Sequence, residues 1–287
     1  MENNLKRNNG NVPTLNVQGR TIAEAWQNAM ITLWNEGIDV PTSFDNPGDP
    51  PSKDATVTVR VDEPLGEPRI HKNYPSGLEG LEHYRLEVTH GVHDHWVDRF
   101  GTKWNYTYHE RLRAYDSGDC KKIDQLENMI QIIEKKAKEG KDLTNRRFQI
   151  ITWIPSVDPK IIDPPCLQRL HFRLIPNEKG EYKLNLNTDW RSRDGYKAWF
   201  MNVWAFTELQ RLVADELSER SGIKIGVGRY CDKSDSLHIY GKDFRGVGGF
   251  EEFLERTKKV DLEKLTWATE FAKPMFVEAR HLLAAQL

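Results

Sequence analysis

Strand-like and helix-like segments are interspersed along this chain without the regular alternation that builds a doubly wound parallel sheet. Segments typical of strands occupy residues 55–61, 148–153, 170–175, 182–188 and 236–241. Apolar residues recur at helical spacing over residues 22–33, 78–90, 123–137 and 203–219, and again from about residue 250 onwards. This order favours an α+β domain in which helices cover a mixed or antiparallel sheet.

Local signals mark several element boundaries. Thr21 is a side-chain cap for the first helix, and Gly140 follows a lysine-rich last turn that ends the helix over 123–137. The turn PNEKGE joins the strands at 170–175 and 182–188, which predicts an antiparallel hairpin. Other segments are predicted to lack regular structure: a loop at 40–54, an irregular segment at 104–115, and glycine-rich turns at 222–228 and 246–249.

Composition limits the class of protein. The 287 residues are 38% hydrophobic, so we expect one α+β domain over residues 1–287, with a flexible tail at 1–16. Lys and Arg number 41 against 43 Asp and Glu, and the net charge of −2 excludes a generally basic nucleic-acid binder. No apolar stretch approaches the length of a membrane span, and the N-terminal segment lacks the apolar core of a signal peptide. We therefore expect a cytoplasmic protein with no membrane or nucleic-acid partner.

Metal binding is not indicated by the candidate ligands. The three cysteines are too few and too widely spaced for a disulfide framework or a zinc site. Three histidines stand close together in THGVHDHW, but their spacing fits no H-x-x-x-H pair and no carboxylate cluster completes a set. These residues are Cys120, Cys166 and Cys231, and His90, His93 and His95. We expect no metal cofactor.

Residues 145–202 gather the side chains that carry chemistry. Pro164 and Pro165 stiffen the approach to Cys166 at the start of a predicted strand, and a nearby arginine favours the reactive thiolate. Arginines together with a serine hydroxyl are natural partners of a phosphate dianion. The segment supplies them as Arg146, Arg147, Arg191 and Ser192. A thiolate beside a phosphate clamp indicates nucleophilic attack on a phosphorylated small molecule.

Five sequence words within residues 104–243 resemble the thymidylate synthase family, especially its archaeal branch. In family order they are YTYHERL, NRRFQIITWIP, DPPCLQRLHFRL, WRSRDGYKAWFMN and SLHIYGKD. The resemblance implies the single-domain fold of that family and a homodimer. It also implies reductive methylation of deoxyuridylate (dUMP) to thymidylate (dTMP), with 5,10-methylenetetrahydrofolate as the co-substrate.

The resemblance implies a role for each matching residue around the nucleotide phosphate and the reacting carbon. Cys166 would be the nucleophile that adds to C6 of the uracil ring. Arg191 and Ser192 would hold the phosphate, and Arg191 would also be the cation nearest the thiol. Arg146 and Arg147 match the pair that the family donates across its dimer interface, so each active site would need both chains.

Further matching residues would contact the base, the sugar and the pterin. Asn202 matches the residue that reads the pyrimidine edge, where its amide donates to O4 and accepts from N3–H, which favours a uridylate over a cytidylate. His238 and Tyr240 match the pair that holds the deoxyribose 3′-hydroxyl. Asp194 matches the pterin-binding carboxylate, and Tyr108 matches a tyrosine near the nucleophile.

The sequence leaves three choices open. The family's catalytic glutamate is either Glu82 or Glu87. Trp190 stands where bacterial and eukaryotic members have glutamine, and RHLLAAQL does not match their apolar C-terminal tail, so a related pterin is the alternative one-carbon carrier. The rival functions are a 5-hydroxymethylase of dUMP, dCMP or CMP, in which water captures the methylene group, and a catalytically silent nucleotide-binding relative.

Overall fold

The computed structural model describes residues 10–98, 101, 104–117 and 121–285. Within this part of the chain the α-helices are α1 (Ile22–Glu36), α2 (Gly77–His90), α3 (Tyr108–Arg113), α4 (Gln125–Lys138), α5 (Trp199–Ser221), α6 (Phe250–Lys259) and α7 (Thr269–Ala284). The longer strands are β1 (Thr14–Gly19), β3 (Ser52–Val61), β8 (Leu167–Pro176), β9 (Tyr182–Trp190) and β11 (Ile225–Ile239). The shorter strands are β2 (Ile38–Val40), β4 (Ile70–His71), β5 (Tyr115–Asp116), β6 (Lys122–Ile123), β7 (Gln149–Ile151), β10 (Arg193–Asp194) and β12 (Thr266–Trp267).

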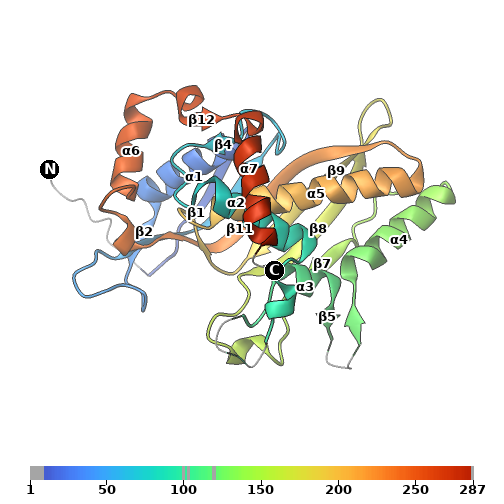
Figure 1. Cartoon of the computed structure of the whole chain (residues 1–287), viewed down its shortest axis with the longest axis horizontal. Coiled ribbons are helices and arrows are strands. Elements are labelled where there is room, and N and C mark those ends of the chain that lie inside the picture. The colour runs from blue at the N-terminus through green and yellow to red at the C-terminus, as the bar shows by residue number, and fades with distance from the viewer. Residues whose placement is uncertain (1–9, 99–100, 102–103, 118–120, 286–287) are drawn as a thin grey trace.

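One mixed sheet is the frame of the molecule (Figure 1). Its main path runs β1-β3-β11-β9-β8-β7, with β2 beside β3 and β10 beside β11. The pairs β1–β3, β9–β11 and β10–β11 are parallel, whereas β3–β11, β8–β9 and β7–β8 are antiparallel. The predicted α+β class, with helices on a mixed sheet, is confirmed.

The β8–β9 hairpin brings the two ends of residues 166–191 together. Leu174 pairs with Leu184 near the turn, and Leu167 pairs with Trp190 at the open end. The predicted antiparallel hairpin is therefore confirmed, and both strands run further than the sequence pattern indicated. This register places the residue before β8 beside the residue after β9.

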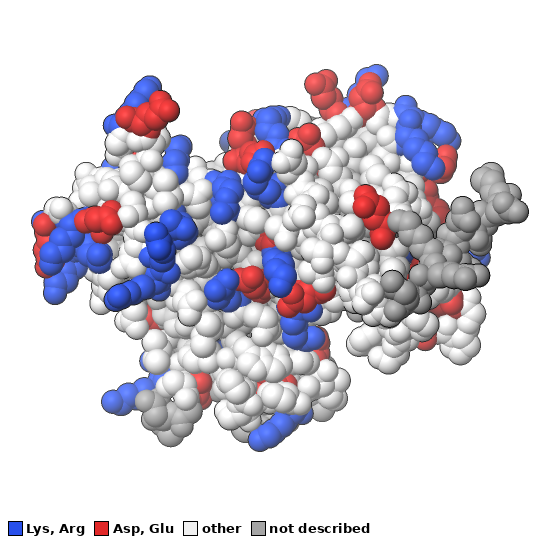
Figure 2. Space-filling view, turned by 180° about the vertical axis from the view of Figure 1, so that it is seen from behind, with Lys and Arg blue, Asp and Glu red and all other residues white. Residues whose placement is uncertain are grey.

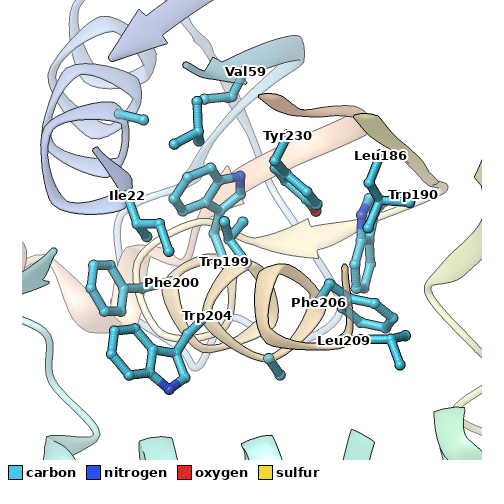
Figure 3. Packing of buried hydrophobic residues seen from close by; sticks show 14 of the residues in the cluster. Ile22, Val59, Leu186, Trp190, Trp199, Phe200, Trp204, Phe206, Leu209 and Tyr230 are labelled. Atoms are coloured by element: carbon cyan, nitrogen blue, oxygen red, sulfur yellow. The ribbon is translucent and has the colours of Figure 1, made fainter. Parts of the chain in front are cut away.

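Helices α1 and α5 cover one face of the sheet and enclose the core. Along β3, Ala55, Val57, Val59 and Val61 are buried and alternate with residues that are partly exposed or exposed, as expected where one face of a strand is covered. Helix α1 packs on β1 and β3, and α5 packs on β11 and β9. Figure 3 shows aromatic side chains of α5, including Trp199, lying between Ile22 of α1 and Val59 and Tyr230 of the sheet.

Helix α2 contacts two other helices, α5 and α7, through different sides. It packs against α5 and against α7, and α5 and α7 also touch through the rings of Trp204 and Phe276. Figure 1 shows the three helices in the same region of the molecule. With about 3.6 residues per turn, residues two apart point to nearly opposite sides of the helix. One side of α2 can therefore serve a site near the sheet while another meets α7.

The surface carries both signs of charge. Figure 2 shows the side opposite to Figure 1, where Lys and Arg side chains are interspersed with Asp and Glu among wide uncharged areas. In the part of the chain that the structure describes, no helix combines the length and apolarity needed to cross a membrane.

Two helix ends follow the predicted signals. The Thr21 hydroxyl accepts a hydrogen bond from the Glu24 amide at 3.4 Å, so the predicted cap of α1 is confirmed. Helix α4 ends at Lys138, and Gly140 follows it with φ +63°, a left-handed conformation that favours glycine.

The predicted N-terminal tail is wrong for residues 14–16. Strand β1 begins at Thr14 and pairs in parallel with β3, with Thr14 opposite Thr56. The ladder of backbone hydrogen bonds holds these residues at the sheet edge. Residues 1–9 of the predicted tail lie outside the described residues, as does Cys120.

Two other segments also differ from the sequence predictions. The glycine-rich stretch 222–228 is not a turn throughout, because β11 begins at Ile225 and finds a partner strand in β9. The segment 104–115 contains helix α3, whose first turn is capped by the Thr107 hydroxyl accepting from the Glu110 amide at 3.0 Å. The sequence analysis predicted an irregular segment here because of its many aromatic residues, and it did not identify Thr107 as a helix cap.

Candidate active site

Cys166 stands at the open end of the β8–β9 hairpin, directly after Pro164 and Pro165. Its side chain is partly buried against the core. The Arg191 amide donates to the Cys166 carbonyl at 2.9 Å, as the hairpin register requires. The cysteine and the predicted phosphate arginine are therefore neighbours by strand pairing.

The Arg191 side chain fixes the proline turn before the cysteine. Its Nε donates to the Pro165 carbonyl at 3.0 Å and its Nη2 to the Pro164 carbonyl at 2.5 Å. Proline carbonyls are available here because the turn makes no strand hydrogen bonds. Among the described residues none accepts from Nη1.

Two effects oppose each other at the thiol. Burial raises the pKa of Cys166 above its usual value, and Arg191 and Arg193 act against this rise. Asp163 adds to the rise because it is a nearby negative charge. The expected influence of arginine on the thiolate is present, but burial outweighs it.

Tyrosine side chains surround the thiol. The Tyr108 hydroxyl accepts a hydrogen bond from the Leu167 amide at 3.1 Å, one residue beyond Cys166, and its ring centroid lies 5.4 Å from that of Tyr106. Burial, and then the proximity of the Cys166 thiolate, raises the pKa of Tyr108. Tyr240 is also close enough for Cys166 to contribute to its pKa, which burial raises to about 12.

Asn202 of α5 meets Tyr84 of α2, a residue that the sequence analysis did not identify. The Asn202 Nδ2 donates to the Tyr84 hydroxyl at 2.7 Å. Burial, with the nearby Tyr108 second, raises the pKa of Tyr84 well above its usual value. No sequence signal distinguishes Tyr84 from an ordinary core tyrosine, because its contact depends on how α2 packs against α5.

The structure separates the two candidate glutamates. Glu82 accepts from Arg85 at 2.7 and 2.8 Å and from Arg280 of α7 at 2.5 Å, so it faces α7. Glu87 faces a cavity of about 260 Å³ that Tyr84, Tyr108 and Asp163 also line. Glu87 accepts from His93 at 2.9 Å, and burial raises its pKa. Of the two, Glu87 lies on the side of Tyr84 and the thiol.

The strand pairing of β10 with β11 brings Asp194 level with His238. One ring nitrogen of His238 lies 3.3 Å from the Ser236 hydroxyl, and Nε2 is buried without a partner among the described residues. Burial lowers the pKa of His238, which favours the neutral ring. The ring lies 4.5 Å from that of Tyr240, so the predicted pair is brought together.

Asp194 is held at the entrance to α5. Its Oδ1 accepts the backbone N–H groups of Tyr196 and Lys197, both at 2.9 Å. Burial raises the pKa of Asp194 to about 6, partly offset by these hydrogen bonds. Its second oxygen, Oδ2, accepts from no described residue.

The predicted phosphate ligands divide into two groups. Ser192 is partly buried directly after Arg191. Arg146 and Arg147 are exposed before β7, where the Arg146 carbonyl lies 3.1 Å from a ring nitrogen of His171. His171 is five residues along β8 from Cys166, about 16 Å at the rise of an extended strand. One chain therefore does not bring this arginine pair to its own thiol.

Arg193 and Trp190 form a buried support beneath the site. The Arg193 guanidinium lies 4.0 Å from the Trp190 ring centroid and 2.9 Å from the Asp232 carboxylate, and both charged side chains are almost fully enclosed. The Trp190 indole donates to the Thr188 hydroxyl at 2.9 Å. Sequence analysis missed Arg193, although it lies within the WRSRD word.

Two of the histidines considered as metal ligands, His90 and His93, make contacts with neighbouring side chains. His93 is bonded to Glu87 and stacks on Trp96, and a ring nitrogen of His90 lies 2.6 Å from the Thr89 hydroxyl. Among the described residues no three His, Cys, Asp or Glu side chains are grouped as metal ligands.

Comparison with known proteins places this geometry in a family. The family model for "Thymidylate synthase" matches residues 76–279, which is more than two thirds of the chain and includes the Cys166 site. The chain belongs to the thymidylate synthase family.

Relatives within the thymidylate synthase family are distant but extend over most of the chain. A protein of Methanococcoides burtonii named "Putative thymidylate synthase" is 26% identical over 79% of this chain and 90% of its own length. A protein of the same name from Methanosarcina mazei is 27% identical over the same shares. A "Thymidylate synthase" of Buchnera aphidicola is 25% identical over 55% of this chain and 53% of its own length.

Proposed function

We propose that this protein is a thymidylate synthase that converts dUMP to dTMP with 5,10-methylenetetrahydrofolate. The observation that carries the proposal is the convergence of three groups. Cys166 is fixed beside Arg191 by backbone pairing. The Asn202 amide is hydrogen-bonded to Tyr84, which lines the same cavity as Tyr108, the tyrosine hydrogen-bonded to the residue after Cys166. A nucleophile, a phosphate ligand and a pyrimidine-reading amide are the parts that this reaction needs.

Nucleotide binding precedes the covalent step in this account. The Arg191 Nη1 and the Ser192 hydroxyl would hold the phosphate, and the neutral His238 with Tyr240 would hold the 3′-hydroxyl. The Asn202 Oδ1 would accept N3–H of the base. Nδ2 has two hydrogens: one is donated to the Tyr84 hydroxyl, and the other would be donated to O4. This pattern matches uracil, whereas cytosine presents an amino group where Nδ2 would need an acceptor.

Cys166 provides covalent activation of the base. Its thiolate forms a bond to C6, and the electron pair of the C5–C6 double bond makes C5 nucleophilic. C5 then forms a bond to the one-carbon unit and loses its proton as the bond between that carbon and the carrier nitrogen breaks. Hydride transfer to the resulting exocyclic methylene gives the methyl group, expels the Cys166 thiolate and restores the C5–C6 double bond. The co-substrate supplies the methylene carbon and the hydride. Glu87 is the carboxyl that we propose for the family's catalytic glutamate, with its proton held more tightly because it is buried.

The residues near Asp194 fit a pterin co-substrate. The Asp194 Oδ2 is an available acceptor for the amino and N–H groups of a pterin ring. Tyr196 and Lys197, next to it, line a cavity of about 380 Å³. The basic residues Lys72, Lys242, Arg245 and Arg256 line the same cavity, and they suit the carboxylates of a folate tail. A related pterin with an acidic tail would meet the same charges.

The arginine pair before β7 supports a shared active site. Arg146 and Arg147 are exposed and about 16 Å along β8 from the thiol of their own chain. We propose that in a homodimer they reach the phosphate bound by the partner subunit. A catalytically silent relative has no need for this complete set of groups.

The test is to incubate the purified full-length protein with dUMP and 5,10-methylenetetrahydrofolate and to identify the nucleotide product by mass. The proposal predicts a gain of one CH2 unit and its loss in a Cys166→Ala variant. A gain of CH2O would instead assign the protein as a 5-hydroxymethylase.

A further inference from the structure

A second cavity lies on the outer side of α2 and α5, away from the thiol. Its volume is about 500 Å³, and residues of α7 form part of its wall. Glu82 and Arg85 of α2 line this cavity, whereas Tyr84 and Glu87 line the cavity beside Cys166. The two cavities therefore occupy different sides of the same helix.

Positive charge exceeds negative charge around this outer cavity. Four arginines line it against two glutamates, namely Arg69, Arg85, Arg211 and Arg280 with Glu82 and Glu208. Glu82 pairs with Arg85 and Arg280, while Glu208 pairs with Arg211. The formal charge of the lining is thus +2, and one guanidinium is left over.

Arg69 is the arginine without a carboxylate partner among the described residues. It is only 6% exposed, and its guanidinium lies 4.1 Å from the Trp204 ring centroid. Its Nη2 donates to the Thr207 hydroxyl at 3.2 Å, and Nη1 has no described acceptor. Glu208 and Glu67 act on this cation electrostatically without forming an ion pair with it, so its direct contacts are one neutral hydroxyl and one ring. An anion in direct contact would offset the cost of burying the guanidinium.

Three residues of this cavity also carry buried polar atoms without partners in the described structure. They are Arg69 Nε, Trp204 Nε1 and Thr269 Oγ1. All three atoms can donate a hydrogen bond, and a buried donor without an acceptor is destabilising. The atoms themselves are buried, so an acceptor in the cavity reaches them only if the side chains around them move. An acceptor-rich group in the cavity would satisfy several of them at once.

We propose that the cavity between α2, α5 and α7 is a second anion site that binds the phosphate or carboxylate group of a small metabolite through Arg69. The apolar side chains of Leu86, Leu212 and Phe276 would contact the rest of the ligand. Phosphate and carboxylate oxygens both match a guanidinium and its neighbouring donors. This site is separate from the nucleotide phosphate position beside Arg191 and does not depend on the reaction proposed above.

The experiment removes the nucleotide phosphate ligand first. Full-length protein carrying Arg191→Ala is titrated in a calorimeter with inorganic phosphate and, separately, with succinate. We expect at least one of the two anions to bind saturably at one site per chain. Phosphate binding alone would identify a phosphorylated ligand, succinate binding alone a carboxylate, and binding of both the shared chemistry.

Two further substitutions in the same background test where the anion binds. Arg69→Gln removes the unpaired cation, and Trp204→Phe keeps an aromatic ring but removes the indole donor. Each should weaken binding, Arg69→Gln by at least about tenfold because a charge-assisted hydrogen bond is lost. Arg60→Gln, at an exposed position on β3, is the matched control and should bind as tightly as the parent. The proposal would be overturned if neither anion bound saturably. It would also be overturned if the folded Arg69→Gln and Trp204→Phe proteins bound the anion as tightly as the Arg191→Ala parent.

Discussion

The side-chain amide of Asn202 donates from Nδ2 to the Tyr84 hydroxyl at 2.7 Å, which links α5 to α2 beside the thiol. In this arrangement the Tyr84 hydroxyl acts as the acceptor and Nδ2 of the amide faces it. With Nδ2 turned toward Tyr84, Oδ1 is the amide atom left to accept from a pyrimidine N3–H. If Asn202 reads the base as proposed, discrimination between uracil and cytosine would depend on a tyrosine that does not need to touch the base.

Replacement of Tyr84 by phenylalanine should weaken this discrimination. The variant loses one hydrogen bond, worth about 0.5–1.5 kcal/mol, so kcat/KM for dUMP should fall about two- to tenfold. Because the freed amide can turn over, binding of dCMP should weaken less than binding of dUMP. Measuring both affinities by calorimetry checks this, and a parallel decline of the two would contradict the role given to Tyr84.

The reactivity of Cys166 should rise with pH above the neutral range. Burial raises the pKa of its thiol, so the thiolate is the minor form at pH 7 and increases as the pH approaches the raised pKa. Replacing Arg191 by glutamine removes the stronger of the two cations that oppose this rise, and should move the pH profile further toward alkaline values. The rate of iodoacetamide labelling, followed on the Cys166 peptide by mass spectrometry, measures the profile.

A labelling profile that did not move in Arg191→Gln would show that Arg191 is electrostatically remote from the thiol. Cys231 offers an internal control, because Arg229 is the first cation acting on it and its profile should stay the same.

The buried pair of Arg193 and Asp232 should be important for stability. Both side chains are almost fully enclosed and lie 2.9 Å apart, so Asp232→Asn leaves an uncompensated buried guanidinium. We expect a loss of about 3 kcal/mol in the free energy of unfolding, measured by urea denaturation at pH 7. Asp235→Asn, at an exposed pair with Lys233, should change stability by less than about 1 kcal/mol. Similar losses of unfolding free energy in the two variants would contradict the stabilising role given to the Arg193–Asp232 pair.

Shared active sites predict complementation between two inactive variants. One variant carries Cys166→Ala, and the other carries Arg146→Gln and Arg147→Gln. In mixed dimers one of the two sites has both an intact cysteine and an intact arginine pair. Random pairing of equal amounts should therefore restore about a quarter of the wild-type activity. If each chain supplied its own arginines, mixing would restore nothing.

The sequence predicted the elements whose signals are local. The Thr21 cap and the hairpin from β8 to β9 need only neighbouring residues, and both are confirmed. The start of β11 could not be predicted in this way, since its glycines indicate a turn. Gly228 lies at the register shift between β11 and β9, where a Cβ would be 2.7 Å from the Asn185 Oδ1, so glycine there permits the close approach of the two strands. The information lies in the neighbouring strand, not in the segment itself.

The candidate site also contains residues that local sequence signals identify and residues that only the packing of the fold identifies. Cys166 and Arg191 could be named from sequence words, and strand register brings them together. Tyr84, and the choice between Glu82 and Glu87, depended on the packing of α2 against α5 and α7. Helical periodicity shows which residues share a face, but it does not say what that face meets.

The most direct test of the central claim is the mass of the nucleotide formed from dUMP and 5,10-methylenetetrahydrofolate. The account predicts a product heavier than dUMP by one CH2 unit, formed by the wild-type protein and absent with Cys166→Ala. A product heavier by CH2O, or methylation that persists in Cys166→Ala, would contradict it.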